Sequence, residues 1–472
     1  MVRAGRPSAL SSFGAYVAAA HAAGRLVVQP RTGFSDPVEM RAALLATKSA
    51  AATTAGTITV DSYTRLGQHE AARKALENGA LLNGYPIVLH GPATTESVLH
   101  GVMAPDFPVQ IRHGAPDPRA IVSTLIAAGL DATEGGPVSY CLPYSRTPLD
   151  ASVTAWSAAC RELAALAETG RRPHLETFGG CMLGQLCPPS MLVALSVLEA
   201  CFFRQHGITD VSLSYAQQTS PDQDFEAVNA LVRIAEERLG DIDRHIVVYA
   251  YMGVYPQTAT GARLLLREAV RLAVRTGSAR LIVKTAVEAS RIPTVAENVD
   301  ALEIAAAHAE DLRRDTSSHG GVVPAESTVE REARALVDAV LELDPDVGRA
   351  LLTAFRRGYL DIPFCLHPDN AGRTRAAIDS DGRLRWTALG ALPIGDIADI
   401  NGARPLHSAE LMTALTYVRR RYDGESPREP TPPIPSGRAR PPAQNWITPD
   451  QTNCYPPRTR ADIFTLPPHD AM

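Results

Sequence analysis

The chain has 472 residues, is 45% hydrophobic and carries a formal net charge of −5 at pH 7. This slightly acidic balance argues against a nucleic-acid-binding protein, and no apolar run reaches the roughly 18–20 residues needed to cross a membrane. Residues 1–24 are alanine-rich but lack the core and cleavage site of a signal peptide, so we expect a cytoplasmic location. The seven cysteines are scattered without a zinc-binding spacing, which predicts buried free thiols and no metal site.

Strand-like apolar runs alternate with amphipathic helical patterns from about residue 24 to 290, behind a lead helix in residues 1–24. This alternation predicts an α/β fold with a parallel sheet, and a (β/α)8 TIM barrel over residues 25–294 fits it best. The nine candidate strands exceed the barrel's need by one, so one is an extra strand or a loop: LVVQP, TITVDS, YPIVLHG, FPVQIRHG, GPVSYCLPY, HLETFGG, VSLSYA, HIVVYAYM and RLIVKT. An open doubly wound sheet is the alternative, which the absence of G-x-G-x-x-G and P-loop motifs disfavours.

The barrel is followed by a mostly helical extension in residues 295–424. It contains long helical patterns, a loop at 315–327 and a small hairpin around the DSDGR turn at 379–383. Residues 425–472 hold a third of the 36 prolines and are expected to be an extended tail. If that tail wraps the body instead, Trp446 and Phe464 are its expected anchors.

Three arginines lie at or just past the end of an apolar run: Arg31, Arg65 and Arg112. A guanidinium group there is costly unless an anion meets it. Because strand ends converge on one face of a barrel, three such groups predict a receptor for a molecule with two carboxylates. The alternative is that each arginine closes a helix or pairs with a nearby acid.

The segment TEGGPVSYCLPY places Glu134, Tyr140 and Tyr144 within one candidate strand and its flanks. The two tyrosines are four residues apart and would share one face of that strand. The glutamate would accept the ammonium group of an amino dicarboxylate, and the tyrosines would donate to its carboxylates. The expected ligand is therefore a small amino diacid.

Two further features concern other strand ends. Gln110 shares a strand face with the third arginine, and His113 follows it. Lys284 stands at a strand end in a chain with only three lysines, which hints at a compact charge that arginine does not reproduce. Since no catalytic triad or metal motif is evident, we expect a cofactor to supply the difficult chemistry.

The chain resembles the epsilon (E) subunit family of glutamate mutase, also called methylaspartate mutase, from about residue 25 to 400. The resemblance rests on VVQPRTG, TITVDSYTR, LLNGYPIV, IRHGAPDPR, TEGGPVSYCLPY, PPSM, YMGVYPQ, LIVKTAVEASRIPT and DIPFCLHPDNAG. It implies an isomerase barrel, dependent on adenosylcobalamin (coenzyme B12), that interconverts L-glutamate and L-threo-3-methylaspartate by a radical rearrangement.

The resemblance also implies roles for individual residues. Substrate contacts would come from Arg31, Arg65, Arg112, His113, Glu134, Tyr140 and Tyr144, with Gln110 adjacent. Contacts to the cobalamin or its adenosyl group would come from Gly33, Asn83, Pro143, Tyr255, Lys284, Glu288 and Ile292. No residues are assigned to a metal ion.

In this family a separate small subunit carries the cobalamin-binding motif D-x-H-x-x-G. Here Asp243 and His245 begin that pattern, but the glycine is missing. The resemblance therefore implies a small cobalamin-binding partner and a homodimer of this chain within a heterotetramer, with no nucleic acid or membrane as partner.

Several stretches depart from the family pattern, among them SYAQQTSPDQD, FGGCMLGQLCPPS, Val287 and the tail beyond residue 400. None of them removes a predicted substrate contact. Two alternatives to the glutamate reaction stay open. One is the same radical chemistry on a related diacid in secondary metabolism. The other is a non-catalytic barrel that serves as a binding or assembly protein.

Overall fold

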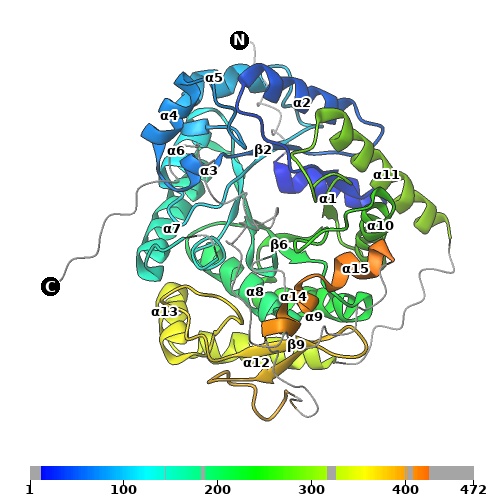
Figure 1. Cartoon of the computed structure of the whole chain (residues 1–472). Helices are drawn as coiled ribbons and strands as arrows, with labels where there is room; N and C mark the ends of the chain where they lie inside the picture. The colour runs from blue at the N-terminus through cyan, green and yellow to red at the C-terminus, as the bar shows by residue number, and fades with distance from the viewer. Residues whose placement is uncertain are drawn as a thin grey trace, which may run out of the picture.

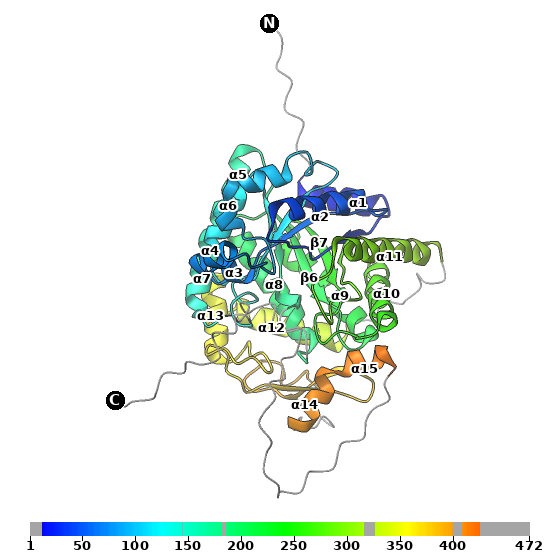
Figure 2. The ribbon, with the colours of Figure 1, turned by 45° about the horizontal axis from the view of Figure 1, so that its top comes forward.

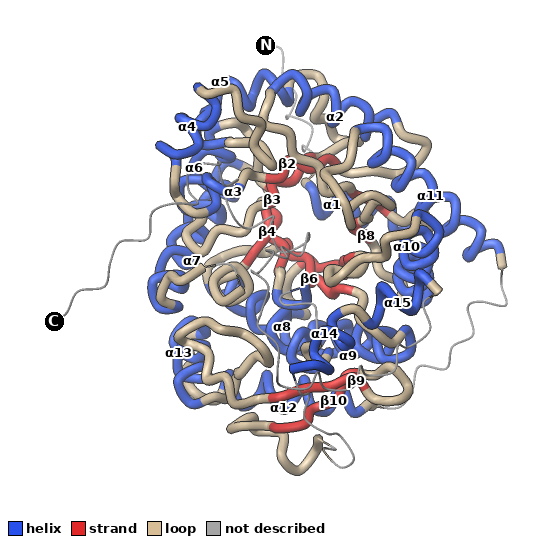
Figure 3. The backbone as a smooth tube through the Cα atoms, in the orientation of Figure 1, coloured by secondary structure: helices blue, strands red, loops and turns tan. Residues whose placement is uncertain are grey.

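The computed structural model describes residues 12–143, 145–181, 186–315, 326–398, 400 and 408–424. Its centre is an eight-stranded sheet in the order β1-β8-β7-β6-β5-β4-β3-β2, with every pair parallel. Single contacts between the first strand and the residues just before the second, such as Val28 N to Thr53 O at 2.9 Å, nearly close the ring. Figure 3 shows this ring of strands inside a ring of helices. The predicted (β/α)8 TIM barrel is therefore confirmed.

The strands are short and mostly buried along their length. Their bounds are β1 (Val27–Gln29), β2 (Gly56–Thr59), β3 (Val109–Arg112), β4 (Ala132–Gly135), β5 (His174–Thr177), β6 (Asp210–Ala216), β7 (Asp243–Tyr249) and β8 (Arg280–Ile282). A separate antiparallel hairpin, β9 (Arg375–Ile378) and β10 (Leu384–Ala388), encloses the predicted DSDGR turn. The hairpin prediction is confirmed.

Helices surround the barrel and extend beyond it (Figure 1). They are α1 (Phe13–Ala22), α2 (Pro37–Ser49), α3 (Ser62–Arg65), α4 (His69–Glu77), α5 (Ile87–Leu99), α6 (Arg119–Ala127), α7 (Leu149–Ala164), α8 (Pro189–Gln205), α9 (Pro221–Leu239), α10 (Ala259–Arg275), α11 (Val295–Arg314), α12 (Thr328–Leu341), α13 (Val347–Arg357), α14 (Ser408–Leu415) and α15 (Tyr417–Asp423). The described residues also form two short 3-10 turns, η1 (Ala165–Thr169) and η2 (Gly179–Cys181). None of the helices in the described ranges has the length and apolar character needed to cross a membrane.

The C-terminal helices cover one side of the barrel. The helix α12 packs on α8 and α9, whereas α15 packs on α10, as the turned view in Figure 2 also shows. The helix α11 contacts α10, α2 and β1, so it completes the ring of helices around the barrel although the sequence placed it in the extension at 295–424. The predicted Pro-rich tail, with Trp446 and Phe464, and most of the predicted loop at 315–327 lie outside the described residues.

Two strand predictions are wrong. YPIVLHG is the surplus candidate, because only Tyr85 forms a bridge, to Val60, before the chain enters α5. A short apolar run fits a buried helix as well as a strand, and periodicity alone does not separate them. GPVSYCLPY is a helical turn, since β4 ends at Gly135 with φ +135° and Leu142 N donates to Val138 O at 3.0 Å.

The helix α1 closes the amino end of the barrel. Phe13 is 1% exposed, stacks on His174 with ring centroids 5.0 Å apart, and lies 4.9 Å from the Arg280 guanidinium. Ser12 caps the helix by accepting from Ala15 N at 3.1 Å. A Cβ on Gly14 would lie 2.1 Å from a carboxylate oxygen of Asp210, so the helix backbone approaches the barrel floor closely.

The packing of α1 against the amino end of the barrel predicts that a change in this helix lowers the stability of the fold. Replacing Phe13 by alanine should lower the free energy of unfolding by about 3–5 kcal/mol, because it leaves a cavity beneath the barrel. The control Val38→Ala changes a side chain that is 75% exposed and should stay within about 0.5 kcal/mol of the parent. Urea denaturation followed by circular dichroism measures both, and equal losses would contradict a sealing role for α1.

Candidate active site

The three predicted arginines come from consecutive β/α units at the carboxyl end of the barrel. Arg112 is the last residue of β3, Arg31 follows β1, and Arg65 ends the one-turn helix α3 after β2. Asp61 caps α3 by accepting from Tyr63 N and Thr64 N at 2.9 and 3.0 Å. The strand-end prediction therefore holds closely for Arg112 and Arg31, whereas Arg65 is carried by a helix.

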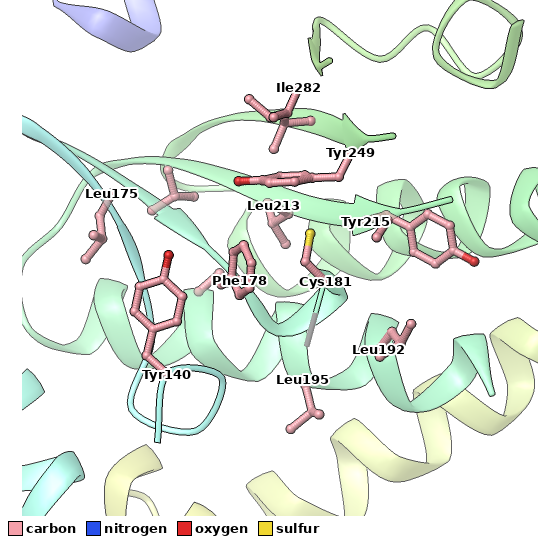
Figure 4. Close-up of a cluster of buried hydrophobic side chains, with 14 of the residues drawn as sticks. Tyr140, Leu175, Phe178, Cys181, Leu192, Leu195, Leu213, Tyr215, Tyr249 and Ile282 are labelled. Atoms are coloured by element: carbon pink, nitrogen blue, oxygen red, sulfur yellow. The ribbon is translucent and has the colours of Figure 1, made fainter. Parts of the chain in front are cut away.

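Arg112 is joined to Glu134 inside the barrel. Its Nη2 lies 3.0 Å from Glu134 Oε2, and both side chains are at most 5% exposed. The Tyr249 hydroxyl donates to Glu134 Oε2 at 2.8 Å, and the Tyr140 hydroxyl donates to Oε1. Figure 4 shows both tyrosines beside Phe178 in the same buried cluster. Burial raises the pKa of Glu134, and the positive charge of Arg112 opposes that rise.

Two buried nitrogen atoms beside this pair have no hydrogen-bond partner. They are Arg112 Nη1 and His113 Nε2. His113 Nδ1 accepts from Ala115 N at 3.1 Å, which assigns the ring proton to Nε2. Burial, reinforced by the charge of Arg65, lowers the pKa of His113 to about 3, so the ring is neutral. Both orphaned atoms are thus donors, and a carboxylate is the group that would satisfy them.

Arg65 faces the same region as these two donors. A Cβ on Gly114 would lie 3.2 Å from Arg65 Cδ, so the arginine side chain passes directly over that glycine. Its Nη2 donates to Ser62 Oγ at 3.0 Å. Asn83 Oδ1 accepts from Ser62 N and Oγ at 3.1 and 2.9 Å, which connects a predicted cofactor contact to a predicted substrate contact.

A second group lies on the loops after β1, β7 and β8. Glu288 Oε2 lies 3.2 Å from Arg31 Nη1 and 3.5 Å from Lys284 Nζ. The lysine ammonium also stands 4.5 Å from the centroid of the Tyr255 ring. The structure therefore brings three predicted cofactor contacts together and links them to a predicted substrate arginine.

The remaining predicted residues are placed as follows. A Cβ on Gly33 would lie 2.5 Å from Thr59 O, so this position needs a glycine. Ile292 is 57% exposed and Pro143 is half-buried. Tyr140 lies in the turn after β4 and not on a strand, which corrects its predicted placement, and Tyr144 is outside the described residues.

Gln110 points into the interior below the mouth. Its Nε2 donates to Glu176 Oε2 at 3.2 Å, and its Oε1 accepts from Gln29 Nε2 at 3.1 Å. In the same layer Arg280 pairs with Glu176, and both side chains are fully buried. Tyr249 bridges the layers, since its hydroxyl also contacts Glu176.

Tyr249, Glu176 and Arg280 are absent from the residues predicted from the sequence. The predicted residues follow from their place at strand ends, whereas Glu176 lies within the run HLET and Arg280 opens the run RLIV. A charged residue inside a buried strand was the available signal, because such a residue requires a partner from another strand.

Fold and site together define a β/α-barrel protein that gathers three arginines and a buried Arg112–Glu134 pair at the carboxyl end of its strands. Comparison with known proteins is more specific. The family described as methylaspartate mutase E chain matches residues 9–410, and the chain belongs to that family. The resemblance inferred from the sequence motifs is thereby confirmed.

Curated relatives agree with this assignment. The glutamate mutase epsilon subunit of Halobacterium salinarum is 34% identical over 346 residues, which cover 72% of each chain. The protein of the same description from Escherichia coli O157:H7 is 31% identical over 357 residues, which cover 73% of each chain.

The buried ion pair generates a prediction. Arg280→Met leaves Glu176 charged without its main partner and should cost about 3–5 kcal/mol of stability. Adding Glu176→Gln should recover part of that loss, so the double variant is less destabilised than the sum of the singles. Urea denaturation of the parent, the two single variants and the double variant measures the free energies of unfolding that this comparison needs. The control Arg349→Met, which removes an exposed partner of Asp344, should cost less than about 1 kcal/mol, and strict additivity at the buried pair would contradict the coupling.

The neutral His113 predicts an acid-sensitive fold. Its folded pKa of about 3 lies below the ordinary 6.5, so between these values the unfolded chain binds a proton that the folded chain excludes. Its contribution to stability is complete above pH 6.5 and is lost as the pH falls toward 3. His113→Gln should therefore show a shallower loss of stability over this range in pH-dependent denaturation, and parallel curves would contradict the assignment.

Proposed function

We propose that this chain is the catalytic component of a glutamate mutase, an isomerase that converts L-glutamate to L-threo-3-methylaspartate with adenosylcobalamin. Family membership supports the class of enzyme, and one observation supports the ligand. Arg112 Nη1 and His113 Nε2 are buried donors that lack a partner next to a carboxylate, Glu134. This pattern suits an amino diacid better than a simple diacid, because the donors take its carboxylate and Glu134 takes its ammonium group.

In this proposal the arginines hold the substrate at its two ends. Arg112 and His113 bind one carboxylate deep in the barrel, where the low dielectric strengthens each charged contact. Arg65 and Arg31 bind the other carboxylate nearer the mouth. Tyr140 and Tyr249 fix Glu134 so that it faces the amino group, and they keep its charge balanced against that of Arg112.

The residues around Lys284 suit the adenosyl part of the cofactor. Glu288 accepts hydrogen bonds of the kind that ribose hydroxyls donate, and beside it the Lys284 ammonium stands over the buried Tyr255 ring. When bound, adenosylcobalamin would supply the radical chemistry that the rearrangement needs. The contact between Glu288 and Arg31 supports this proposal, because it makes a residue proposed for the cofactor a neighbour of one proposed for the substrate, and the buried barrel interior would shield the reaction from water.

The cobalamin itself is proposed to be held by a small partner subunit with the D-x-H-x-x-G motif. The partial match in this chain does not serve that role. His245 lies on β7 with its ring stacked 5.1 Å from that of His174, and burial lowers its pKa far below the ordinary value. A half-buried ring near the barrel floor offers no ligand to a large cofactor at the mouth.

The direct test combines the chain, the small subunit, adenosylcobalamin and L-glutamate without oxygen. Formation of 3-methylaspartate, followed by nuclear magnetic resonance, is expected. Turnover of a related diacid in preference to glutamate would change the substrate, and no product with a partner shown to be competent would refute the proposal.

Arg112→Lys should lower turnover by about 100-fold or more, because an ammonium group does not reproduce the planar guanidinium that holds Glu134 with Nη2 and presents Nη1 to the substrate carboxylate. The matched control is Arg349→Lys, a surface position that should keep parent activity. Comparison of kcat/KM for the two variants measures the effect, and equal values would exclude Arg112 from the site.

A further inference from the structure

The turn that carries Tyr140 is held from behind by Glu199 of α8. Val138 N and Ser139 N donate to Glu199 Oε1 at 3.2 and 2.8 Å, and Ser139 Oγ donates to Oε2 at 2.9 Å. The Glu199 side chain is fully buried. Three donors from one short turn therefore converge on a carboxylate that has no access to water.

The glycines in front of the turn make this contact possible. A Cβ on Gly136 would lie 2.0 Å from Glu199 Oε1, so any larger residue expels the carboxylate. A Cβ on Gly135 would lie 2.4 Å from the Trp156 ring and 2.5 Å from the Tyr140 ring. The turn is thus fixed on one side by Glu199 and on the other by Trp156.

We propose that Glu199 is a positioning residue whose ionised carboxylate fixes the turn at 136–142 and thereby holds the Tyr140 hydroxyl against Glu134. Glu199 acts through this turn and does not itself touch the ligand. The inference rests on the proposed function, because it assumes that Glu134 and Tyr140 face the amino diacid. The reason is geometric: the amides of Val138 and Ser139 precede Tyr140 directly, so the orientation of Tyr140 follows from theirs.

The contact depends on the charge of Glu199. An ionised carboxylate accepts all three hydrogen bonds, whereas a protonated one carries an O–H that competes with the Ser139 hydroxyl. Burial raises the pKa of Glu199 to about 7, and the hydrogen bonds from Ser139 and Val138 oppose that rise. The turn is therefore fixed above about pH 7 and loosens as the pH falls below it.

The other titratable groups near Glu199 can be separated from it in a pH titration. From α7, the Cys160 thiol faces it with a pKa raised far above neutrality by burial, and Cys181 of η2 is likewise raised. From α12, Glu332 contacts Ser190 at the other end of α8. On the far side of the turn lie His113, with a pKa of about 3, and Glu134, which all the variants below retain.

The test uses Trp156 as a reporter in the full chain, without partner or cofactor. Its ring lies 6.2 Å from that of Tyr140, and replacing Trp386 and Trp446 by phenylalanine leaves it as the single tryptophan. Emission should change between pH 5.5 and 8.5 with a midpoint near 7. Glu199→Gln should abolish this transition, and Ser139→Ala should move its midpoint upward because one donor to the carboxylate is lost.

Asp224→Asn is the matched control. Asp224 is a second buried carboxyl group whose pKa burial raises to about 7, but it lies on α9 and contacts Tyr215 and Gln218. Figure 4 shows the Tyr215 hydroxyl directed away from Tyr140. The Trp156 transition should survive in this variant. A transition that persists in Glu199→Gln, or that disappears in Asp224→Asn, would overturn the inference.

A second readout uses the assembled enzyme. Glu199→Gln should raise the KM for glutamate about tenfold at pH 8, which corresponds to the loss of one well-placed hydrogen bond to a charged group, and should change kcat much less. An unchanged KM would also overturn the inference. Because the fluorescence transition needs no turnover, absence of mutase activity refutes the proposed function alone and leaves the role of Glu199 to be decided by Trp156.

Discussion

The barrel depends on one buried ion pair, Glu176 with Arg280, at the centre of its interior. Both side chains are fully buried, where an unpaired charge is costly. The pair is therefore surrounded by polar side chains that satisfy its remaining atoms. Arg280 Nη1 donates to Gln29 Oε1 at 2.5 Å, and Arg280 Nη2 donates to Ser212 Oγ at 2.9 Å. Through Tyr249 this network reaches Glu134, so the geometry of the mouth is set from the interior.

The sequence predicted the barrel because two patterns alternate along it. In the amphipathic helices the apolar residues recur with a period of 3.6 residues, whereas the buried strands are short apolar runs without that period. The failures occurred where the signal is short. YPIVLHG has strand-like composition, but Pro86 and the kink at Gly91 belong to a helix entrance. Gly135, just before GPVSYCLPY, and Gly136, its first residue, end the strand and allow close packing by Trp156 and Glu199, which no local propensity reports.

The candidate site was predictable where a costly side chain follows a strand, as Arg112 does. It was not predictable where the chemistry arises from convergence of distant strands. Tyr249 lies 115 residues from Glu134 in the chain, and Glu176 lies 104 residues from Arg280. Gln110 shows the converse: it shares a strand with Arg112 but serves the layer beneath. The position of a residue along a strand predicts the face on which its side chain lies. The depth of that side chain along the barrel axis depends on the register of all eight strands.

The helix α1 gives the barrel a floor. Phe13, His174 and Arg280 fill the amino end, so whatever meets Glu134 enters and leaves by the carboxyl end alone. A barrel that is open at one end constrains the order in which its ligands bind. If a large cofactor or partner covers that end, a small ligand at Glu134 would have to bind before it and would leave after it. Such an order of binding and release would follow from the topology of the barrel, independently of the affinity of either ligand.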